Sequence, residues 1–319
     1  MNPTQAANFF MAHDDYLILT HVRPDGDTVG CAAGLCLCLR QLEKKAHILP
    51  NPEITSLFSP YWEGLLAPEG YEPSTVVAVD LAARSLFPDN AKPYLDRVDL
   101  TIDHHPSQEF YARETCLDAG RAACGELIYD IARRLGPITP EMGRALYVAV
   151  STDCGGFVYS NTTAQTHRVA ADLIDSGFDL YPVNRLHFRT KSLKRLKLEG
   201  MLAAGLELQD GGATALVYLT LDMLRQLEAR ERDVEDIASF VGQIEGVRNG
   251  VTLRELKPGE WKLSLRTDPG DLNASAVCAL LGGGGHAAAA GATFPAGSRE
   301  EARDRVLAAI GQVRGGTEG

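Results

Sequence analysis

The stretch Val98-Asp99-Leu100-Thr101-Ile102-Asp103-His104-His105-Pro106 decides how the rest of this sequence is interpreted. Its apolar residues alternate with polar ones and predict a β-strand that ends at Asp103. Two histidines and a proline follow at once, so negative charge and metal-binding nitrogen collect where the strand ends. Taken alone, a capped turn with two surface histidines explains the stretch equally well. The other segments of the chain decide between these two interpretations.

Two more predicted strands lead directly into acidic residues. The strand Tyr16–Thr20 runs into His21-Val-Arg-Pro-Asp25-Gly-Asp27, where a proline and a glycine predict a loop before a helix that starts near Asp27. The strand Thr75–Val79 is almost entirely β-branched or apolar and ends at Asp80. Such an uninterrupted apolar run is typical of a parallel strand that is covered on both faces.

Predicted helices alternate with these strands. One covers residues 123–135, a second starts at Thr139-Pro140-Glu141 and runs toward Val150, and a third covers residues 163–176. The second helix leads into Ser151-Thr-Asp153-Cys-Gly-Gly-Phe157, whose paired glycines predict a loop that carries Asp153. The alternation predicts an α/β fold with a parallel sheet. Ligands of such sheets bind at the carboxyl ends of the strands, where all these acidic residues are expected.

A second, smaller α/β unit follows a basic segment. Strands are expected at residues 213–219, 251–256, 261–266 and 290–294, and helices at residues 221–228, 234–241, 272–281 and 298–313. We therefore expect an N-terminal domain over residues 1–188, a basic helical linker over 189–206 and a C-terminal domain over 207–319. The basic residues from Arg185 to Lys197 fit either a solvated helix face or a contact with substrate phosphates.

Composition narrows the possible functions. The chain has 319 residues and a formal net charge of −11. Its hydrophobic content of 45% and its charged content of 23% are typical of globular proteins. The negative charge argues against binding to long nucleic acid, which depends on many contacts between basic residues and phosphates. No apolar run is long enough for a membrane span, and the N-terminus does not resemble a signal peptide. Seven cysteines without a metal-type spacing favour a reduced, cytoplasmic protein.

Six side chains supply the chemistry expected at the edge of the first sheet. They are four carboxylates and two imidazoles: His21, Asp25, Asp27, Asp80, His104 and Asp153. Four carboxylates in one place would repel one another unless cations neutralise them. Two divalent ions would do so, with Mn²⁺ as the best match to this donor set and Mg²⁺, Co²⁺ or Fe²⁺ as alternatives. A metal pair about 3.5–4 Å apart activates water and stabilises a phosphoryl displacement, which indicates a hydrolase.

The second unit offers groups that could bind a phosphate. Arg266 can hold a phosphate with two hydrogen bonds, and His286 can donate another. The glycines before this histidine, Gly282 to Gly285, would let backbone N–H groups turn toward one anion. A flexible linker is the alternative explanation for four glycines. Their position inside a folded unit favours a role for Gly283, Gly284 and Gly285 in substrate binding.

Taken together, these motifs resemble the DHH phosphoesterase superfamily over nearly the whole chain. The N-terminal motifs are His21-Val-Arg-Pro-Asp25-Gly-Asp27, Val79-Asp80, Asp103-His104-His105 and Ser151-Thr-Asp153-Cys-Gly-Gly-Phe157. The DHH-associated C-terminal domain is matched by Ser264-Leu-Arg266 and by Gly282-Gly-Gly-Gly-His286-Ala-Ala-Ala-Ala-Gly291. Length and both sets of motifs are most similar to the NrnA-type members, which act as oligoribonucleases and as phosphatases of 3′-phosphoadenosine-5′-phosphate (pAp).

The resemblance implies a role for each residue. One metal ion would be held by His21, Asp25 and Asp80, and the other by Asp27, Asp80, His104 and Asp153, so that Asp80 bridges the two. His105 would face the substrate phosphate, and Asp103 would orient a ligand from behind. Asp80, Asp103, His104 and His105 are thus the expected catalytic residues. The implied substrates are short RNA and small nucleotides, and a homodimer is one possible assembly.

Other functions remain open at this level. The same site could serve a phosphodiesterase of cyclic dinucleotides or of their linear product pApA. Pyrophosphatase activity fits less well, because those relatives carry a lysine-containing motif in place of the Gly-His element; an exopolyphosphatase is a further alternative. A nucleotide sensor without activity would be expected to lack a ligand, and none is missing here. Cys154 and Ala290 stand where family members often have Thr and Ser, which bears on substrate preference and touches no expected metal ligand.

Overall fold

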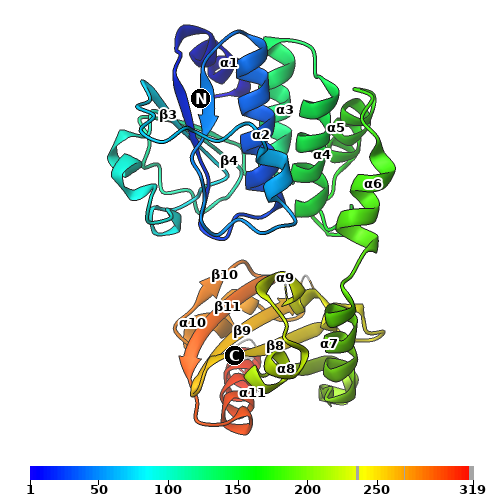
Figure 1. The fold of residues 1–319 in the computed structure, drawn as a ribbon. Helices are drawn as coiled ribbons and strands as arrows, with labels where there is room; N and C mark the ends of the chain where they lie inside the picture. Colours follow the sequence, from blue (N-terminus) through cyan, green and yellow to red (C-terminus); the bar gives the residue numbers. More distant parts are fainter. Residues whose placement is uncertain (235–236, 269, 316–319) are drawn as a thin grey trace. The chain divides into compact units, whose positions relative to one another are not determined.

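The computed structural model describes residues 1–234, 237–268 and 270–315 (Figure 1). The chain divides into two compact units, Met1–Thr190 and Lys191–Gly319. Each unit contains its own sheet and its own hydrophobic clusters. A separate linker over residues 189–206 stays a prediction. None of the described helices combines the length and the apolar character needed to cross a membrane.

The sheet of the first unit is parallel throughout, as the sequence predicts. Its strands lie in the order β2-β1-β3-β4-β5. The strands are β1 (Tyr16–Leu19), β2 (Ala46–Ile48), β3 (Thr75–Val79), β4 (Leu100–Asp103) and β5 (Glu114–Leu117). The edge strand β5 is absent from the sequence analysis, because its four residues show no clear apolar alternation. Parallel strands place their carboxyl ends at one edge, so β1, β3 and β4 bring their following residues together.

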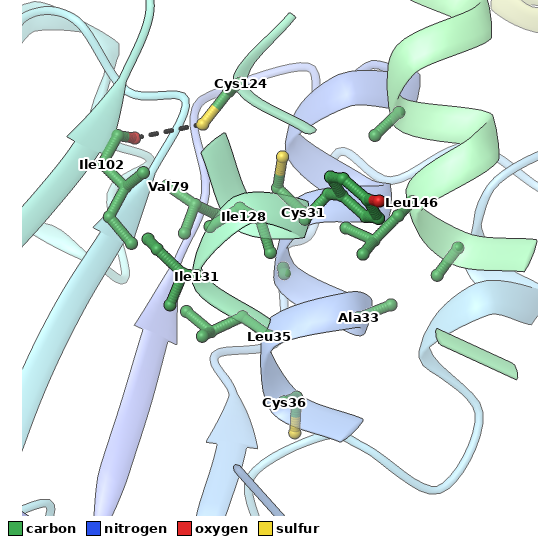
Figure 2. Close-up of a cluster of buried hydrophobic side chains, with 14 of the residues drawn as sticks. Cys31, Ala33, Leu35, Cys36, Val79, Ile102, Cys124, Ile128, Ile131 and Leu146 are labelled. Carbon is green, nitrogen blue, oxygen red and sulfur yellow. Dashed lines mark hydrogen bonds between the residues drawn. The ribbon is translucent and has the colours of Figure 1, made fainter. Parts of the chain in front are cut away.

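Both faces of this sheet are buried. Tyr16 and Ile18 of β1 belong to the large cluster on the helical face, whereas Leu17 and Leu19 contribute to a separate cluster on the opposite face. The helices are α1 (Pro3–Ala12), α2 (Gly26–Gln41), α3 (Cys124–Leu135), α4 (Pro140–Asp153), α5 (Ala164–Ile174), α6 (Leu180–Asn184) and a π-helical turn, Arg185–Arg189. Figure 2 shows side chains from α2, α3, β3 and β4 packed in the larger cluster. The opposite face is covered largely by irregular segments and two short 3₁₀ helices, η2 (Arg84–Leu86) and η3 (Lys92–Arg97).

Glycines spaced four residues apart let α2 approach α4 very closely. A Cβ atom at Gly30 would lie 2.3 Å from the carbonyl oxygen of Ala145, and one at Gly26 would lie 2.1 Å from Oγ1 of Thr152. Gly34 is crowded in the same way by Leu146. This packing brings the C-terminal end of α4 beside the N-terminal end of α2. Two segments far apart in the sequence thereby meet at the carboxyl edge of the sheet.

We expect the substitution Gly30→Ala to destabilise the protein by about 1–3 kcal/mol, because the added methyl group meets backbone that cannot move aside easily. Thermal unfolding should detect a melting temperature lower by at least a few degrees. Gly200→Ala is the matched control, since Gly200 lies in a helix with nothing within 4 Å of its Cβ position. Equal melting temperatures of Gly30→Ala and the wild type would contradict the close packing of α2 and α4.

The second unit has a mixed sheet in the order β10-β11-β9-β8-β7-β6. The strands are β6 (Glu207–Gln209), β7 (Thr214–Leu219), β8 (Asn249–Lys257), β9 (Glu260–Thr267), β10 (Gly284–Gly285) and β11 (Ala289–Pro295). Strands β7 and β8 are parallel and the other pairs are antiparallel. The predicted hairpin between β8 and β9 is present, and its turn uses Gly259 at φ +80°, where glycine is favoured.

Helices of the second unit follow the sequence analysis except in one place. They are α7 (Leu193–Ala204), α8 (Leu221–Leu227), α9 (Glu231–Val234), α10 (Ala274–Leu280) and α11 (Arg299–Gly315). The predicted helix over 234–241 is not confirmed as one element. Residues 235 and 236 of that range lie outside the described residues, and only short 3₁₀ turns, Ile237–Ser239 and Val241–Gln243, follow them. Helix α7 packs Leu198 and Leu202 into the core of this unit.

Candidate metal centre

All six predicted metal ligands lie at the carboxyl edge of the parallel sheet, although Asp153 sits on a different element from the one expected. Asp27 lies in the first turn of α2, because the side chain of Asp25 caps this helix and lets it begin at Gly26. Oδ1 of Asp25 accepts hydrogen bonds from the backbone N–H groups of Asp27 (3.0 Å) and Thr28 (3.2 Å). Asp153 is the last residue of α4 and does not belong to the loop that follows.

A first group of ligand atoms comes from the β1–α2 connection and the end of β3. Nε2 of His21 lies 3.6 Å from Oδ1 of Asp25 and 3.8 Å from Oδ2 of Asp80. One donor atom from each of these three residues can be chosen so that all lie within 4.8 Å of one another. Nδ1 of His21 is 2.7 Å from the carbonyl oxygen of Val22, which accepts its proton. Nε2 therefore keeps its lone pair toward the two carboxylates.

A second group surrounds His104. Its Nε2 lies 3.8 Å from Oδ2 of Asp27 and 3.7 Å from Oδ2 of Asp153. These three residues also have ligand atoms within 4.8 Å of one another. Nδ1 of His104 is 3.1 Å from the carbonyl oxygen of Arg121, so the ring again presents Nε2 to the carboxylates. This carbonyl partner could not be predicted, because a backbone carbonyl leaves no signature in a sequence.

Asp80 belongs to the first group and also forms a third group of possible ligands with His104 and His105. Its Oδ2 faces His21, whereas its Oδ1 is 3.7 Å from Nε2 of His104 and 3.4 Å from Nδ1 of His105. The residue is only 2% exposed, and among the described residues its buried Oδ1 has no hydrogen-bond partner. Asp80 also has φ +52°, an uncommon conformation for a non-glycine residue. A buried carboxylate oxygen that lacks a hydrogen bond, in a strained residue, fits a position that a cation would fill.

The pKa values of the buried carboxylates also indicate a site for cations. Burial, followed by repulsion from Asp25, raises the pKa of Asp27 to about 7. Burial and the charge of Asp27 likewise raise the pKa of Asp153 to about 7. Burial and the neighbouring carboxylates raise the pKa of Asp80 well above its usual range. Positive charge is therefore needed to keep all these carboxylates ionised near neutral pH. An all-oxygen-and-imidazole donor set suits divalent ions such as Mn²⁺ and Mg²⁺.

Asp103 faces away from both groups and holds His105. Its Oδ1 accepts hydrogen bonds from the backbone N–H of His104 (2.7 Å) and from both the backbone N–H (3.0 Å) and Nδ1 (2.8 Å) of His105. Its Oδ2 accepts a bond from Nε2 of Gln108, a partner that the sequence analysis missed. Burial opposes protonation of His105, but the hydrogen bond and charge of Asp103 leave the pKa of His105 above its usual value.

Helix α3 is held by the same site. The two oxygens of Asp27 accept hydrogen bonds from the first N–H groups of α3, those of Cys124 (2.7 Å) and Gly125 (2.9 Å). The residue at the N-cap, Ala123, has no side chain that could cap the helix. A carboxylate from α2 thus performs the capping that sequence reasoning looks for next to the helix itself.

In the second unit, the predicted phosphate-binding residues share one end of the sheet. Arg266, on β9, pairs with Ala289 of β11, and the carbonyl of Ala289 accepts the N–H of His286 (2.8 Å). The glycine segment differs from the expected anion-binding loop. Gly284 and Gly285 form strand β10, and the N–H of Gly283 is bonded to the carbonyl of Cys278. Several of its amides are therefore already used, while Arg266 and His286 are exposed.

The parallel sheet carries at its carboxyl edge histidine–carboxylate groups that could hold metal ions, and the family and relatives of the chain identify a phosphoester hydrolase. Residues 15–150 match the DHH family, N-terminal domain, and residues 213–313 match the DHHA1 domain. The chain belongs to the DHH family, whose phosphoesterases need divalent metal ions.

Relatives with assigned activities cover most of the chain. It is 32% identical over 297 residues to the bifunctional oligoribonuclease and PAP phosphatase NrnA of Thermus thermophilus, covering 92% of this chain and 88% of that protein. The protein of the same name from Bacillus subtilis is 27% identical, covering 96% of each. Among solved structures, an exopolyphosphatase-related protein from Bacteroides fragilis superimposes with a TM-score of 0.86 at 25% identity, covering 97% of this chain and 95% of that one.

Proposed function

We propose that this protein hydrolyses very short oligoribonucleotides and pAp, using two divalent ions with Mn²⁺ preferred. The observation that carries the proposal is the unpaired, buried Oδ1 of Asp80 between two groups of ligand atoms. His21, Asp25 and Asp80 would hold one ion, and Asp27, Asp80, His104 and Asp153 the other. Relatives named oligoribonuclease and PAP phosphatase at up to 32% identity support the choice of substrates.

The ions, when bound, would supply the activation of water and the neutralisation of charge on the leaving oxygen. The chain's own residues orient the substrate. Because Nδ1 of His105 donates to Asp103, protonation places the second N–H of the ring at Nε2. Asp103 raises the pKa of His105 and favours this protonated form, which can donate a hydrogen bond to a phosphate oxygen. His105 is thus the proposed phosphate contact of the first unit.

Arg266 and His286, with the backbone of Gly283, Gly284 and Gly285, are the proposed phosphate contacts of the second unit. Both side chains are exposed and lie at one end of the same sheet. Their exposure leaves them accessible to a ligand. Some basic groups of the segment from Arg185 to Lys197 instead form ion pairs with an acidic residue. Lys191 and Arg195, for example, both pair with Glu199. Arg266 is therefore a better candidate for phosphate recognition than the basic residues from Arg185 to Lys197.

We expect Arg266→Ala to raise the KM for pAp by about tenfold or more with little change in kcat, because a hydrogen bond to a charged group contributes about 1.5–3 kcal/mol. Steady-state kinetics with Mn²⁺ measures both constants. Arg225→Ala is the control, since Arg225 is an exposed arginine on α8 that pairs with Asp222. Unchanged kcat and KM in Arg266→Ala would remove Arg266 from the site.

A turnover assay tests the proposed function directly. Purified protein with Mn²⁺ would be offered pAp, pApA, an RNA pentamer, cyclic di-AMP, pyrophosphate and polyphosphate. Release of mononucleotide from the pentamer and of phosphate from pAp is the expected result. Polyphosphate is the second candidate substrate, because the Bacteroides fragilis structure is of an exopolyphosphatase-related protein. No hydrolysis of any compound would overturn the proposal.

We also propose a cellular compartment and an assembly for this protein. All seven cysteines are buried and unpaired, which supports a reducing compartment such as the cytoplasm. Size-exclusion chromatography of the active protein would distinguish a monomer from the homodimer that the resemblance to the family allows.

A further inference from the structure

One asparagine outside the ligand groups links two of the segments that build them. Asn161 lies in the connection between α4 and α5, and its side chain is exposed. Its Nδ2 donates to the carbonyl oxygen of Ala122 at 2.9 Å and to that of Asp153 at 3.2 Å. Both hydrogens of one amide nitrogen are thereby used on two backbone segments. Neither segment is adjacent to Asn161 in the sequence.

Both carbonyl groups belong to backbone that holds the second group of ligands. Asp153 is itself a member of that group. Ala122 lies in the segment 121–125, where the carbonyl of Arg121 accepts from His104 and the N–H groups of Cys124 and Gly125 hold Asp27. Through Asn161, the segment that holds His104 and Asp27 is therefore joined to Asp153. All three residues of the second group are fixed to one another in this way.

The first group is held differently. His21 is oriented by the carbonyl of Val22, and Asp25 by the N–H groups that begin α2. Among the described residues, no hydrogen bond joins His21, Asp25 or Asp80 to Asn161 itself, and the segment 121–125 reaches this group only where Cys124 bonds to the backbone of Asp80. The first group is linked to the second through Asp80 and through the backbone N–H of Asp27, which donates to Asp25. Asn161 bonds directly only to backbone of the second group, so a change at Asn161 should act much more strongly on that group than on the first.

We propose that Asn161 is a positioning residue that sets the affinity of the divalent ion held by Asp27, His104 and Asp153, without touching that ion. This inference rests on the two-ion site of the proposed function. Outer hydrogen-bonding partners of metal ligands typically change metal affinity by about 10–100-fold when they are removed. The effect should be much larger in one of the two binding steps than in the other.

The test is Mn²⁺ binding to the full-length, metal-free protein, measured by calorimetry and by the electron paramagnetic resonance of free Mn²⁺. The wild type should bind two ions. Asn161→Ala, which loses both donors without adding charge, should weaken one binding step by about 10–100-fold and change the other much less. In kinetics, the Mn²⁺ concentration needed for half-maximal rate should rise, and kcat at saturating Mn²⁺ should recover.

The controls separate this inference from the proposed function. Gln41→Ala removes another exposed amide that donates to a backbone carbonyl, that of Pro137, at the far end of α2, and should leave both binding steps unchanged. Two wild-type-like binding steps in the Asn161 variants, or equal weakening of both, would overturn the role of Asn161 alone. A wild type that binds no Mn²⁺ would overturn the proposed function as well. Since Asn161 is exposed, its removal leaves no cavity, and Asn161→Ser offers a milder variant if melting temperatures fall.

Discussion

Asp80→Asn is expected to lower kcat/KM by about 10³-fold or more and to raise the melting temperature of the metal-free protein. The loss of activity follows from the position of Asp80 between the two groups of ligands. Bound metal ions contribute several kcal/mol to a phosphoryl-transfer transition state, and each 1.4 kcal/mol corresponds to a factor of ten in rate. Removing the shared carboxylate should disturb both ions together.

The gain in stability has a separate cause. Without metal, Asp80 places a carboxylate beside Asp27 in a buried site, and the pKa of Asp80 is raised by burial and by that neighbour. Folding therefore carries an electrostatic cost that a neutral amide of the same shape avoids. Asparagine is also enriched among non-glycine residues with positive φ, so it suits the φ of +52° at this position. Asp80→Ala would combine the loss of charge with backbone strain and is the less informative variant.

Melting curves in EDTA and in Mn²⁺ measure both effects. Mn²⁺ should raise the melting temperature of the wild type and have little effect on Asp80→Asn. Asp172→Asn serves as the control, because Asp172 is a half-exposed acid that pairs with Arg133 outside the ligand groups. A rate within tenfold of the wild type would show that Asp80 does not bridge two ions. A metal-free variant less stable than the wild type would show that the Asp80 carboxylate does not destabilise the metal-free site.

The position of the site was predictable because one rule of α/β folds decides it. Strands β1 and β3 are apolar runs that end at histidine or aspartate, and parallel strands bring such ends to one edge. His21, Asp80 and His104 could therefore be grouped without coordinates. Their grouping required only the type and order of the elements, which long periodic segments reveal well.

The supports of the site could not be predicted, because they depend on contacts between distant segments. Nothing near Asn161 in the sequence indicates that its amide reaches both Ala122 and Asp153. The capping of α3 by Asp27 is equally remote, at a separation of 97 residues. The end of α4 was also misjudged, because the helix runs on to Asp153 where a loop was expected. The hydroxyl of Thr152 bonds back to the carbonyl of Val148 within this last turn.

The glycine segment shows a different limit. Four consecutive glycines are compatible with a loop, a linker or a strand, since glycine restricts none of these conformations. The neighbouring strand decides the outcome: Gly284 and Gly285 pair with Gly291 and Ala290 of β11. A Cβ at Gly283 would lie 2.1 Å from the carbonyl oxygen of Gly291, so close approach of the two backbones requires glycine there. Gly283 and Gly285, whose Cβ positions are both crowded by β11, thus have a packing role besides any contact with a phosphate.

In the metal-free wild type, the free energy of unfolding is expected to fall as the pH rises from about 4 to about 7. The fall is measured relative to a variant that lacks one of the buried acids. The pKa values of Asp27 and Asp153 rise from an ordinary value of 3.8 to about 7 in the folded protein. Between these values the folded state binds more protons than the unfolded state. Stability therefore decreases with pH in this window. A single pKa unit of difference corresponds to about 1.4 kcal/mol, or a few degrees in melting temperature.

Comparison with Asp153→Asn isolates this effect from all other titrating groups. Both proteins share every other acid and base, so their difference in melting temperature in EDTA reports mainly on Asp153 and its interaction with Asp27. The melting temperature of Asp153→Asn, relative to that of the wild type, should rise as the pH increases from 4.5 to 7.5. A constant difference across this range would mean that Asp153 titrates normally in the folded protein.

Mn²⁺ should oppose this loss of stability with rising pH. Metal ions bind deprotonated carboxylates and neutral imidazoles, so metal and protons compete for the same atoms. As the pH rises, the sites lose protons and bind Mn²⁺ more tightly, which stabilises the folded state in proportion to occupancy. The difference between the melting temperatures in Mn²⁺ and in EDTA should therefore widen from pH 5.5 to pH 7.5. A difference that stays constant or narrows would show that these raised pKa values do not belong to metal ligands.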